Sequence, residues 1–236
     1  MAGPGPEQGS AVSCLTTTFC VAGDAGGEIQ IGTPPVATST TITSAPATAV
    51  AGQPVTVGVS VTSAQAGTGA ATPGGTATIT VGSRSCSATL SGSAGVASGS
   101  CKITESAPGS DHVSASYAAQ GSFATSATSA SSVLRVGKAA ARVRLKLSAS
   151  RVKYGREHSE RLTVTVTPQY TGTPGGKIVI LTGSKTVCSK SLSKGKAACL
   201  LASRRLRPGS YRLRVRYDGN ADFKSAYSSY ARLRVT

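Results

Sequence analysis

The stretch PGSYRLRVRYDGNADF, residues 208–223, decides the fold. Apolar and cationic side chains alternate along its centre, in the order Tyr211, Arg212, Leu213, Arg214, Val215, Arg216 and Tyr217. Because successive side chains of a strand point to opposite faces, the stretch predicts a strand with one apolar and one cationic face, followed by a turn at DGN. The same frame occurs one hundred residues earlier as PGSDHVSASYAAQGSF, residues 108–123. The chain is therefore expected to contain a two-fold repeat.

The repeat divides the 236 residues into a leader over 1–35 and two domains over 36–136 and 137–236. A domain of about 100 residues can bury roughly 60–70% of the surface that its unfolded chain exposes. Three Phe, seven Tyr and no Trp leave most of that burial to aliphatic side chains. Short alternating runs between Gly and Pro turns, without a long 3.6-residue period, predict an all-β fold.

Seven strands are expected in each domain, which favours two tandem immunoglobulin-like β-sandwiches behind a short N-terminal β-hairpin. In the first domain they cover 38–44, 53–63, 75–82, 85–91, 95–103, 111–118 and 127–136. In the second they cover 141–149, 158–168, 175–182, 185–192, 196–202, 210–217 and 227–235.

The net charge of +16 is unevenly distributed. Residues 1–137 hold three basic and five acidic residues, whereas residues 138–236 hold 22 basic and four acidic ones. The second domain therefore carries a net charge of +18 and the rest of the chain −2. Two copies of one frame with opposite charge indicate different surroundings or partners.

The six cysteines fall into three local pairs: Cys14 with Cys20, Cys86 with Cys101, and Cys188 with Cys199. Two of these pairs stand at matched places in the two repeats. An even number at matched positions predicts disulfides and an oxidising compartment, although six cysteines allow 15 connectivities. We expect each matched pair to join adjacent strands of a hairpin. A zinc site is the alternative, but no CxxC pair is present and both histidines lie far from these cysteines.

The N-terminal segment VSCLTTTFCVAGDAGGEIQI, residues 12–31, predicts a hairpin with strands at 19–22 and 28–31 and a turn at 24–27. It resembles one unit of the SC-x4-FCVA-x-D-x-x-G repeats of secreted actinobacterial proteins, which implies a propeller-like blade. One blade cannot close a propeller, so this resemblance implies a longer parent protein. A leader clipped by a disulfide is the alternative.

The two repeats carry a second resemblance. LTVTVTP at 162–168, TGTPGGKIVIL at 171–181, KGKAAC at 194–199, RPGSYRLRVRYDGNADF at 207–223 and RLRVT at 232–236 look like a bacterial Ig-like repeat. VAGQPVTV, TPGGTATITVG and PGSDHVSASYAAQGSF follow the same frame more loosely in the first domain. Such repeats occur in tandem in exported and cell-surface proteins, mostly as spacers, stalks or adhesive modules. The resemblance therefore implies a non-enzymatic, extracellular or cell-surface segment with no cofactor, although fold alone does not fix function.

Eight cations are the strongest candidates for a binding site: Arg142, Arg144, Lys146, Arg212, Arg214, Arg216, Arg232 and Arg234. We expect all eight to share one outer sheet face, because the first strand of such a sandwich can pair with the seventh. Arginine makes bidentate contacts with phosphate and carboxylate groups. The hypothesis is that the second domain binds an anionic polymer such as a cell-wall polymer, acidic polysaccharide, lipid head groups or nucleic acid. The alternative is a solvated face whose charge resists aggregation.

Nucleic acid is the less favoured anion because we expect no aromatic side chain among these cations, and single-strand binders usually stack bases on aromatic rings. Asp218, Asn220 and Asp222 begin like a calcium loop, but Phe223 and Ser229 stand where Gly and Glu are required. A plain turn with Asx-type capping is therefore the favoured interpretation.

Catalytic machinery is not apparent. The two histidines, His112 and His158, lack a nearby nucleophile motif, and no paired carboxylates or phosphate-binding Gly loop are visible. No apolar run reaches the length of a membrane span, and MAGPGPEQGS does not resemble a signal peptide. Cysteines of the disulfide type without a signal peptide predict either a fragment of a longer exported protein or an export route that the sequence does not reveal.

Overall fold

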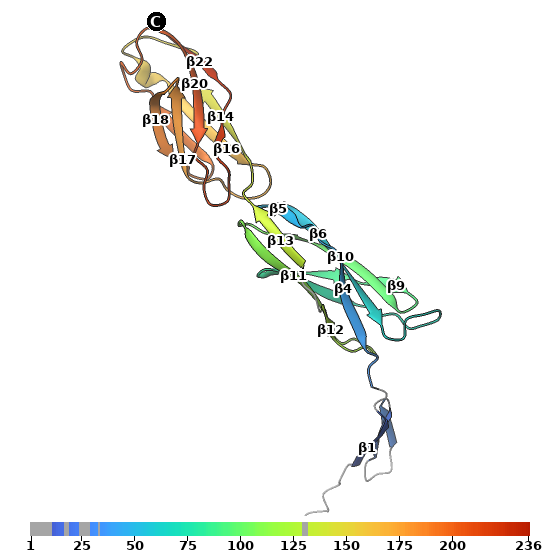
Figure 1. Ribbon diagram of the computed structural model, residues 1–236. Coiled ribbons are helices and arrows are strands. Elements are labelled where there is room, and N and C mark those ends of the chain that lie inside the picture. Colours follow the sequence, from blue (N-terminus) through green and yellow to red (C-terminus); the bar gives the residue numbers. More distant parts are fainter. Residues whose placement is uncertain (1–10, 17–18, 24–28, 33, 129–131) are drawn as a thin grey trace, which may run out of the picture.

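The structure is a computed structural model of residues 1–236. It describes residues 11–16, 19–23, 29–32, 34–128 and 132–236, with side chains from residue 34 onward. Two β-sandwiches lie end to end along one axis (Figure 1). The predicted all-β class is confirmed, and the one helical element among the described residues is a single 3-10 turn, η1 (Glu157–Ser159).

The leader contains a three-stranded antiparallel sheet of β1 (Ala11–Thr16), β2 (Phe19–Gly23) and β3 (Ile29–Gly32). β2 and β3 correspond to the predicted hairpin, whereas β1 was not predicted. Cys14 and Cys20 are register partners in β1 and β2. The predicted turn at 24–27 and the side chains of these two cysteines lie outside the described residues, so that disulfide stays a prediction.

The first sandwich packs a four-stranded sheet against a six-stranded one. The smaller sheet has the order β4 (Thr38–Ser44), β6 (Pro54–Ser63), β10 (Val96–Thr104), β9 (Ser91–Ser93). The larger has the order β5 (Thr48–Val50), β13 (Ser132–Gly137), β11 (Gly109–Tyr117), β7 (Thr76–Val81), β8 (Arg84–Thr89), with β12 (Ser126–Ala127) also paired to β11.

The second sandwich repeats this strand order, except that its smaller sheet has three strands and, among the described residues, no counterpart of β9. Its smaller sheet has the order β14 (Ala141–Leu147), β16 (Arg161–Pro168), β19 (Lys196–Leu200). The larger has the order β15 (Arg151–Val152), β22 (Ala231–Val235), β20 (Gly209–Tyr217), β17 (Lys177–Thr182), β18 (Lys185–Ser191), with β21 (Ala226–Tyr227) also paired to β20.

Each sandwich has its own apolar core, built from the inward-facing residues of the alternating strands. Val57, Val59 and Val61 of β6 are fully buried, and Tyr117 and Tyr217 are the largest fully buried side chains. At about 25 cal/mol per Å² of apolar area, such aliphatic side chains provide the main stabilisation. The aromatic-poor composition is therefore compatible with two small cores.

Two features of the strands differ from the expectation. The short strands β5 and β15 were not predicted. After the first strand of each domain, which lies in the smaller sheet, the chain crosses to the larger sheet, where the short strand pairs in parallel with the last strand of the domain. The last predicted strand of each domain is also broken, into β12 and β13 and into β21 and β22. Both differences determine where the candidate site lies.

Disulfides join Cys86 to Cys101 and Cys188 to Cys199. The expectation that each pair spans adjacent hairpin strands was wrong. Cys188 lies in β18 of the larger sheet and Cys199 in β19 of the smaller one, and the first domain repeats this arrangement between β8 and β10. Each disulfide therefore ties the two sheets of its sandwich together at one side.

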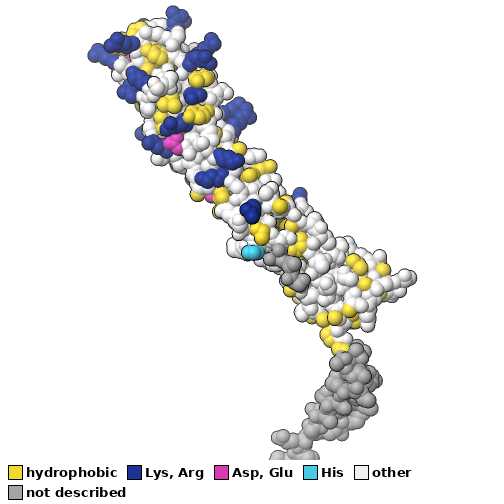
Figure 2. All heavy atoms as spheres, viewed as in Figure 1, with side chains coloured by type: hydrophobic (Ala, Val, Ile, Leu, Met, Phe, Trp, Pro, Cys, Tyr) yellow, Lys and Arg dark blue, Asp and Glu magenta, His cyan; other side chains and the backbone are white. Residues whose placement is uncertain are grey.

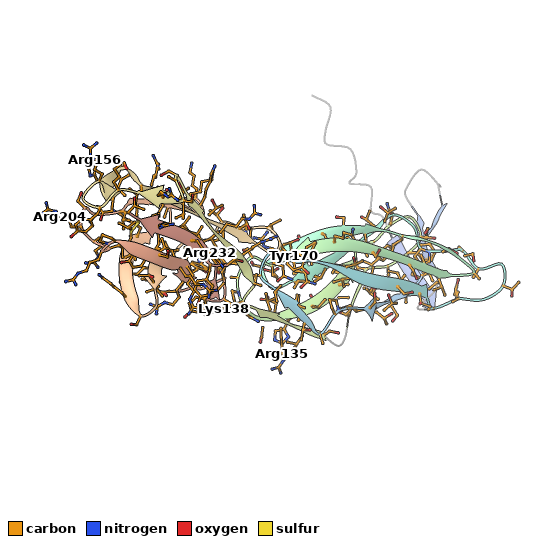
Figure 3. All side chains as sticks on the ribbon, turned by 90° about the horizontal axis from the view of Figure 1, so that it is seen from above. Arg135, Lys138, Arg156, Tyr170, Arg204 and Arg232 are labelled. Carbon is orange, nitrogen blue, oxygen red and sulfur yellow. A yellow bond between two sulfur atoms is a disulfide. The ribbon has the colours of Figure 1, made fainter. Side chains whose placement is uncertain are left out.

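The two domains touch directly at their junction. β13 ends at Gly137, and the backbone of Ala139 already donates a hydrogen bond to Asp222 O at 2.9 Å, so one residue separates the two ladders. Gly52 O accepts a hydrogen bond from Thr171 Oγ1 at 3.0 Å. Ala51, which is 2% exposed, packs in the core of the second domain. In Figure 3, Lys138 and Tyr170 mark this junction.

Candidate functional site

The charge of the second domain is almost uncompensated. Lys and Arg atoms are frequent on its visible face and sparse on that of the first domain (Figure 2). Among the described residues of the second domain, one ion pair with a carboxylate is present, between Arg216 Nε and Asp218 Oδ1 at 2.9 Å. An exposed pair of this kind contributes at most about 1 kcal/mol. No other described cation of this domain is paired with a carboxylate, so most of its positive charge is uncompensated within the domain.

Two of the four carboxylates in this domain are used inside the fold. Glu160, 1% exposed, accepts hydrogen bonds from Ser148 N and Ala149 N at 2.8 and 2.9 Å. Glu157, 0% exposed, accepts one from Arg204 N at 3.0 Å. These acids hold loops through backbone N–H groups, so they do not neutralise the surface. Sequence counting missed this role because it cannot distinguish a buried carboxylate from an exposed one.

The eight predicted cations do not share one sheet face. β14 pairs with β16 in the smaller sheet, so Arg142, Arg144 and Lys146 project from that sheet. The arginines of β20 and β22 project from the larger sheet. The prediction was wrong because only the short strand β15 crosses over to pair with β22. Within the larger sheet, Arg212 and Arg232 stand directly opposite each other, an arrangement that is destabilising for like charges.

Tyr227 and Tyr230 lie among these cations, 52% and 50% exposed. The guanidinium of Arg212 lies 4.4 Å from the ring centre of Tyr230, and that of Arg214 lies 4.3 Å from the ring centre of Tyr227. The expectation that the basic face lacks aromatic side chains was wrong. The sequence predicts one continuous strand over 227–235 that includes both tyrosines. In the structure, β21 ends at Tyr227 and β22 begins only at Ala231, so Tyr230 lies in the connection between them. We call Tyr227 and Tyr230 the tyrosine pair.

A groove runs along the free edge of β14, between the two sheets. It consists of two adjoining cavities of about 610 and 460 Å³ that share Arg142, Val143 and Ser229. Arg144 and Lys146 line the second cavity together with Tyr230, and Tyr227 lines the first. This edge groove therefore brings the β14 cations to the tyrosine pair, on whose rings the β20 arginines rest.

The first domain closes the equivalent edge with hydrogen bonds. The isolated β-bridges Val36–Phe123 and Ala139–Phe223 occupy equivalent places in the two domains and so show which residues correspond there. Thr38 Oγ1 donates to Ser126 Oγ at 2.7 Å, and Thr40 Oγ1 lies 2.7 Å from the same oxygen. The matching positions of the second domain hold Ala141, Val143 and Ala226, which cannot form this seam. The outward residues Ser39, Thr41 and Thr43 are replaced by Arg142, Arg144 and Lys146.

The candidate calcium loop is a capped turn. Asn220 Oδ1 accepts hydrogen bonds from Asp222 N and Phe223 N at 2.9 and 2.8 Å. Asp218 is paired with Arg216, and Lys138 Nζ donates to Asn220 O at 2.7 Å. An ammonium group on this loop opposes a divalent cation. Within the part of the chain that the structure describes, no group of three or more His, Cys, Asp or Glu is placed to hold a metal.

The histidines lie apart. His112 lies in β11 opposite Val133. His158 Nδ1 lies 3.0 Å from Ser203 Oγ at an exposed site. A nucleophile–base pair also needs an orienting group, and the neighbouring Glu157 is directed to Arg204 N instead.

The described residues include no helix long and apolar enough to cross a bilayer.

The second domain can be compared with known families. Residues 145–236 match the bacterial Ig-like domain (group 3). The matched residues include both disulfide cysteines of the second sandwich and the tyrosine pair. The first sandwich has the same strand order, with the additional strand β9 in its smaller sheet. No curated protein matches the chain.

Solved structures with a similar fold include fibronectin(III)-like modules of Clostridium thermocellum CbhA, at 16% identity over 83% of this chain and 92% of that one, with a TM-score of 0.31. The Yersinia pseudotuberculosis adhesin InvE is 11% identical over 84% of this chain and 58% of its own, with a TM-score of 0.34. The D0–D1 domains of intimin are 16% identical over 84% and 97%, with a TM-score of 0.28. Similarities this weak support no statement about partners.

Proposed function

We propose that this chain is a rigid two-domain spacer segment of an exported or cell-surface bacterial protein. The observation that carries the proposal is the direct joint between the domains. Gly52 O accepts hydrogen bonds from Thr171 N and Thr171 Oγ1, and a single residue, Lys138, separates the two ladders. A joint this short leaves little freedom for independent motion of the domains, in contrast to a flexible linker. The two disulfides favour an oxidising compartment.

The far end of the second domain holds a position that is equivalent to the joint. This position provides a control. Ala51 N donates to Gly137 O, and Tyr154 N donates to Thr236 O in the same way. Gly52 and Gly155 follow these residues, and both have a positive φ, of 78° and 81°. A Cβ at Gly52 would overlap the carbonyl oxygen of Thr171, whereas a Cβ at Gly155 meets no atom within 4 Å.

Gly52→Ala and Gly155→Ala therefore carry the same backbone strain, of about 1 kcal/mol, but only the first disrupts the joint. Small-angle scattering and residual dipolar couplings of the full chain measure the relative orientation of the domains. The spacer proposal expects one fixed orientation for the native chain and for G155A, and a broader distribution for G52A. Independent alignment of the two domains in the native chain would contradict it.

A second function is favoured by the uncompensated charge: binding of a polyanion by the second domain. Of its 22 basic residues, only Arg216 is paired with a carboxylate, and an anion would relieve repulsion such as that between Arg212 and Arg232. Retention of the full chain on immobilised heparin should fall steeply with salt. The Arg212→Ser, Arg214→Ser, Arg216→Ser variant should elute at lower salt. Elution of the native chain in the void volume at low salt would refute this function.

A further inference from the structure

The geometry points to the edge groove as the binding site of a single acidic polysaccharide chain, whose carboxylate or sulfate groups pair with Arg142, Arg144 and Lys146. This inference rests on the polyanion-binding function proposed above and adds both its site and its ligand class. The groove lies between the free edge of β14 and residues 227–231, along the open side of the second sandwich.

The spacing of the cations suits a linear ligand. Arg142, Arg144 and Lys146 are alternate residues of one strand, and all three side chains are exposed. Alternate residues of a strand lie about 6.6–6.8 Å apart, so the three charges form a straight row along the groove. An extended polymer with a repeating anionic group can contact all three, whereas a small anion can contact only one or two.

The tyrosine pair also holds two arginines of β20, which do not themselves line either cavity of the groove. Arg212 and Arg214 rest on the rings of Tyr230 and Tyr227, with Arg214 also 5.4 Å from the ring centre of Tyr230. A guanidinium held on a ring loses less conformational freedom on binding, which favours bidentate contacts with carboxylate or sulfate. A ligand in the groove would thus contact the β14 cations directly, and the two β20 arginines would add positive charge next to the tyrosine rings that line it.

Neutral polar groups favour a sugar chain over nucleic acid. Thr167, Gln169 and Ser229 line the first cavity beside Tyr227, and such side chains match the hydroxyl groups of sugars. Single-stranded nucleic acid gains affinity by stacking bases on free aromatic faces. Here each ring of the tyrosine pair has a guanidinium on one face. The disulfides also favour a compartment outside the reducing cytosol.

The first domain supplies the substitutions for the test. A groove variant, Arg142→Ser, Arg144→Thr and Lys146→Thr, restores the residue types at positions 39, 41 and 43. A matched control, Lys153→Ser, Arg156→Ser and Lys190→Ser, removes the same charge from exposed positions that do not line the edge groove. Arg156 lies at the distal end of the domain (Figure 3). Circular dichroism would verify that both variants fold.

Titration calorimetry of the full chain would use heparin and hyaluronate oligosaccharides and an oligothymidylate of equal charge, at one salt concentration. We expect the groove variant to lose roughly tenfold to a hundredfold in affinity for the saccharides, as for three exposed ion pairs, and the control variant to lose less. No binding of any polyanion by the native chain would refute the proposed function itself. Saccharide binding with equal losses in both variants would leave that function standing and refute the groove.

Two further outcomes would overturn parts of the inference. Tighter binding of oligothymidylate than of either saccharide would contradict the ligand class. A groove variant that binds saccharide normally but dimerises in sedimentation would instead show that the β14 cations keep this edge strand unpaired.

Discussion

The two domains share one framework but differ in how they finish the same edge. The first domain seals the edge of β4 with Thr and Ser hydroxyl groups, whereas the second leaves an open groove lined by cations at the edge of β14. The core positions, the disulfide that ties the sheets together and the parallel pairing of the short crossover strand are common to both. The comparison shows that a sandwich can change its surface chemistry while its interior pattern stays the same.

The ends of the two domains differ in a similar way. Ala51 is buried against the second domain, while Tyr154, at the equivalent position, is 44% exposed. One structural position therefore serves as a joint in one domain and as free surface in the other.

The largest effect is expected from the disulfides. Replacing both cysteines of one pair by Ala should destabilise its domain by about 3 kcal/mol, because a loop of this length regains its freedom in the unfolded chain. Cys199 is 4% exposed and belongs to the core, whereas Cys86 and Cys101 are only partly buried. Loss of the 188–199 pair should therefore cost more. Calorimetric unfolding of the full chain, resolved into two transitions, measures both values.

Equal losses of stability in the two domains would mean that the burial of Cys199 adds nothing to the stabilisation that comes from closing the loop. A loss of stability near zero for either pair would contradict the expectation that closing these loops stabilises the domains.

The strand pattern and the cysteine pairs of the two sandwiches could be predicted from the sequence because both are local signals. Alternation in 210–217 and the turn residues beside it are sufficient to place β20. The position of β14 relative to β22 could not be predicted, because it depends on the crossover strand β15, which has only two residues, Arg151 and Val152. The cation–tyrosine contacts were missed for the same reason: Tyr230 lies in a connection rather than in a strand.

A smaller effect is expected at the matched core tyrosines. Tyr217 donates its hydroxyl hydrogen to Gly175 O at 2.7 Å, whereas the buried hydroxyl of Tyr117 has no partner among the described residues. Tyr217→Phe should destabilise the second domain by about 1 kcal/mol, and Tyr117→Phe should leave the first domain unchanged or slightly more stable. Urea unfolding of the two variants compares them directly. Equal losses would show that Tyr117 has a partner in solution, such as water.

The smallest effect concerns pH and is confined to the first domain. Burial raises the pKa of Glu105, and the nearby charge of Asp111 raises it further, against the opposing charge of Arg84 at 3.6 Å. Because the folded pKa exceeds the unfolded one, the folded state binds more protons in the window between the two values. Stability of this domain should therefore rise as the pH falls through the folded pKa to the unfolded one, near 4.5.

Glu105→Gln should flatten this part of the pH profile. The measurement is the difference between the native chain and E105Q in the first-domain unfolding transition, followed from neutral pH downwards. A profile that is identical in both chains would show that Glu105 is ionised as readily in the fold as in the unfolded chain.

Amide chemical shifts recorded while the full chain is titrated with a heparin oligosaccharide compare the two domains in one sample. Our interpretation predicts that shifts move along residues 142–146 and 227–234, while residues 36–128 stay unchanged. Shifts of similar size in both domains, or shifts confined to the second domain but away from the β14 edge, would contradict it.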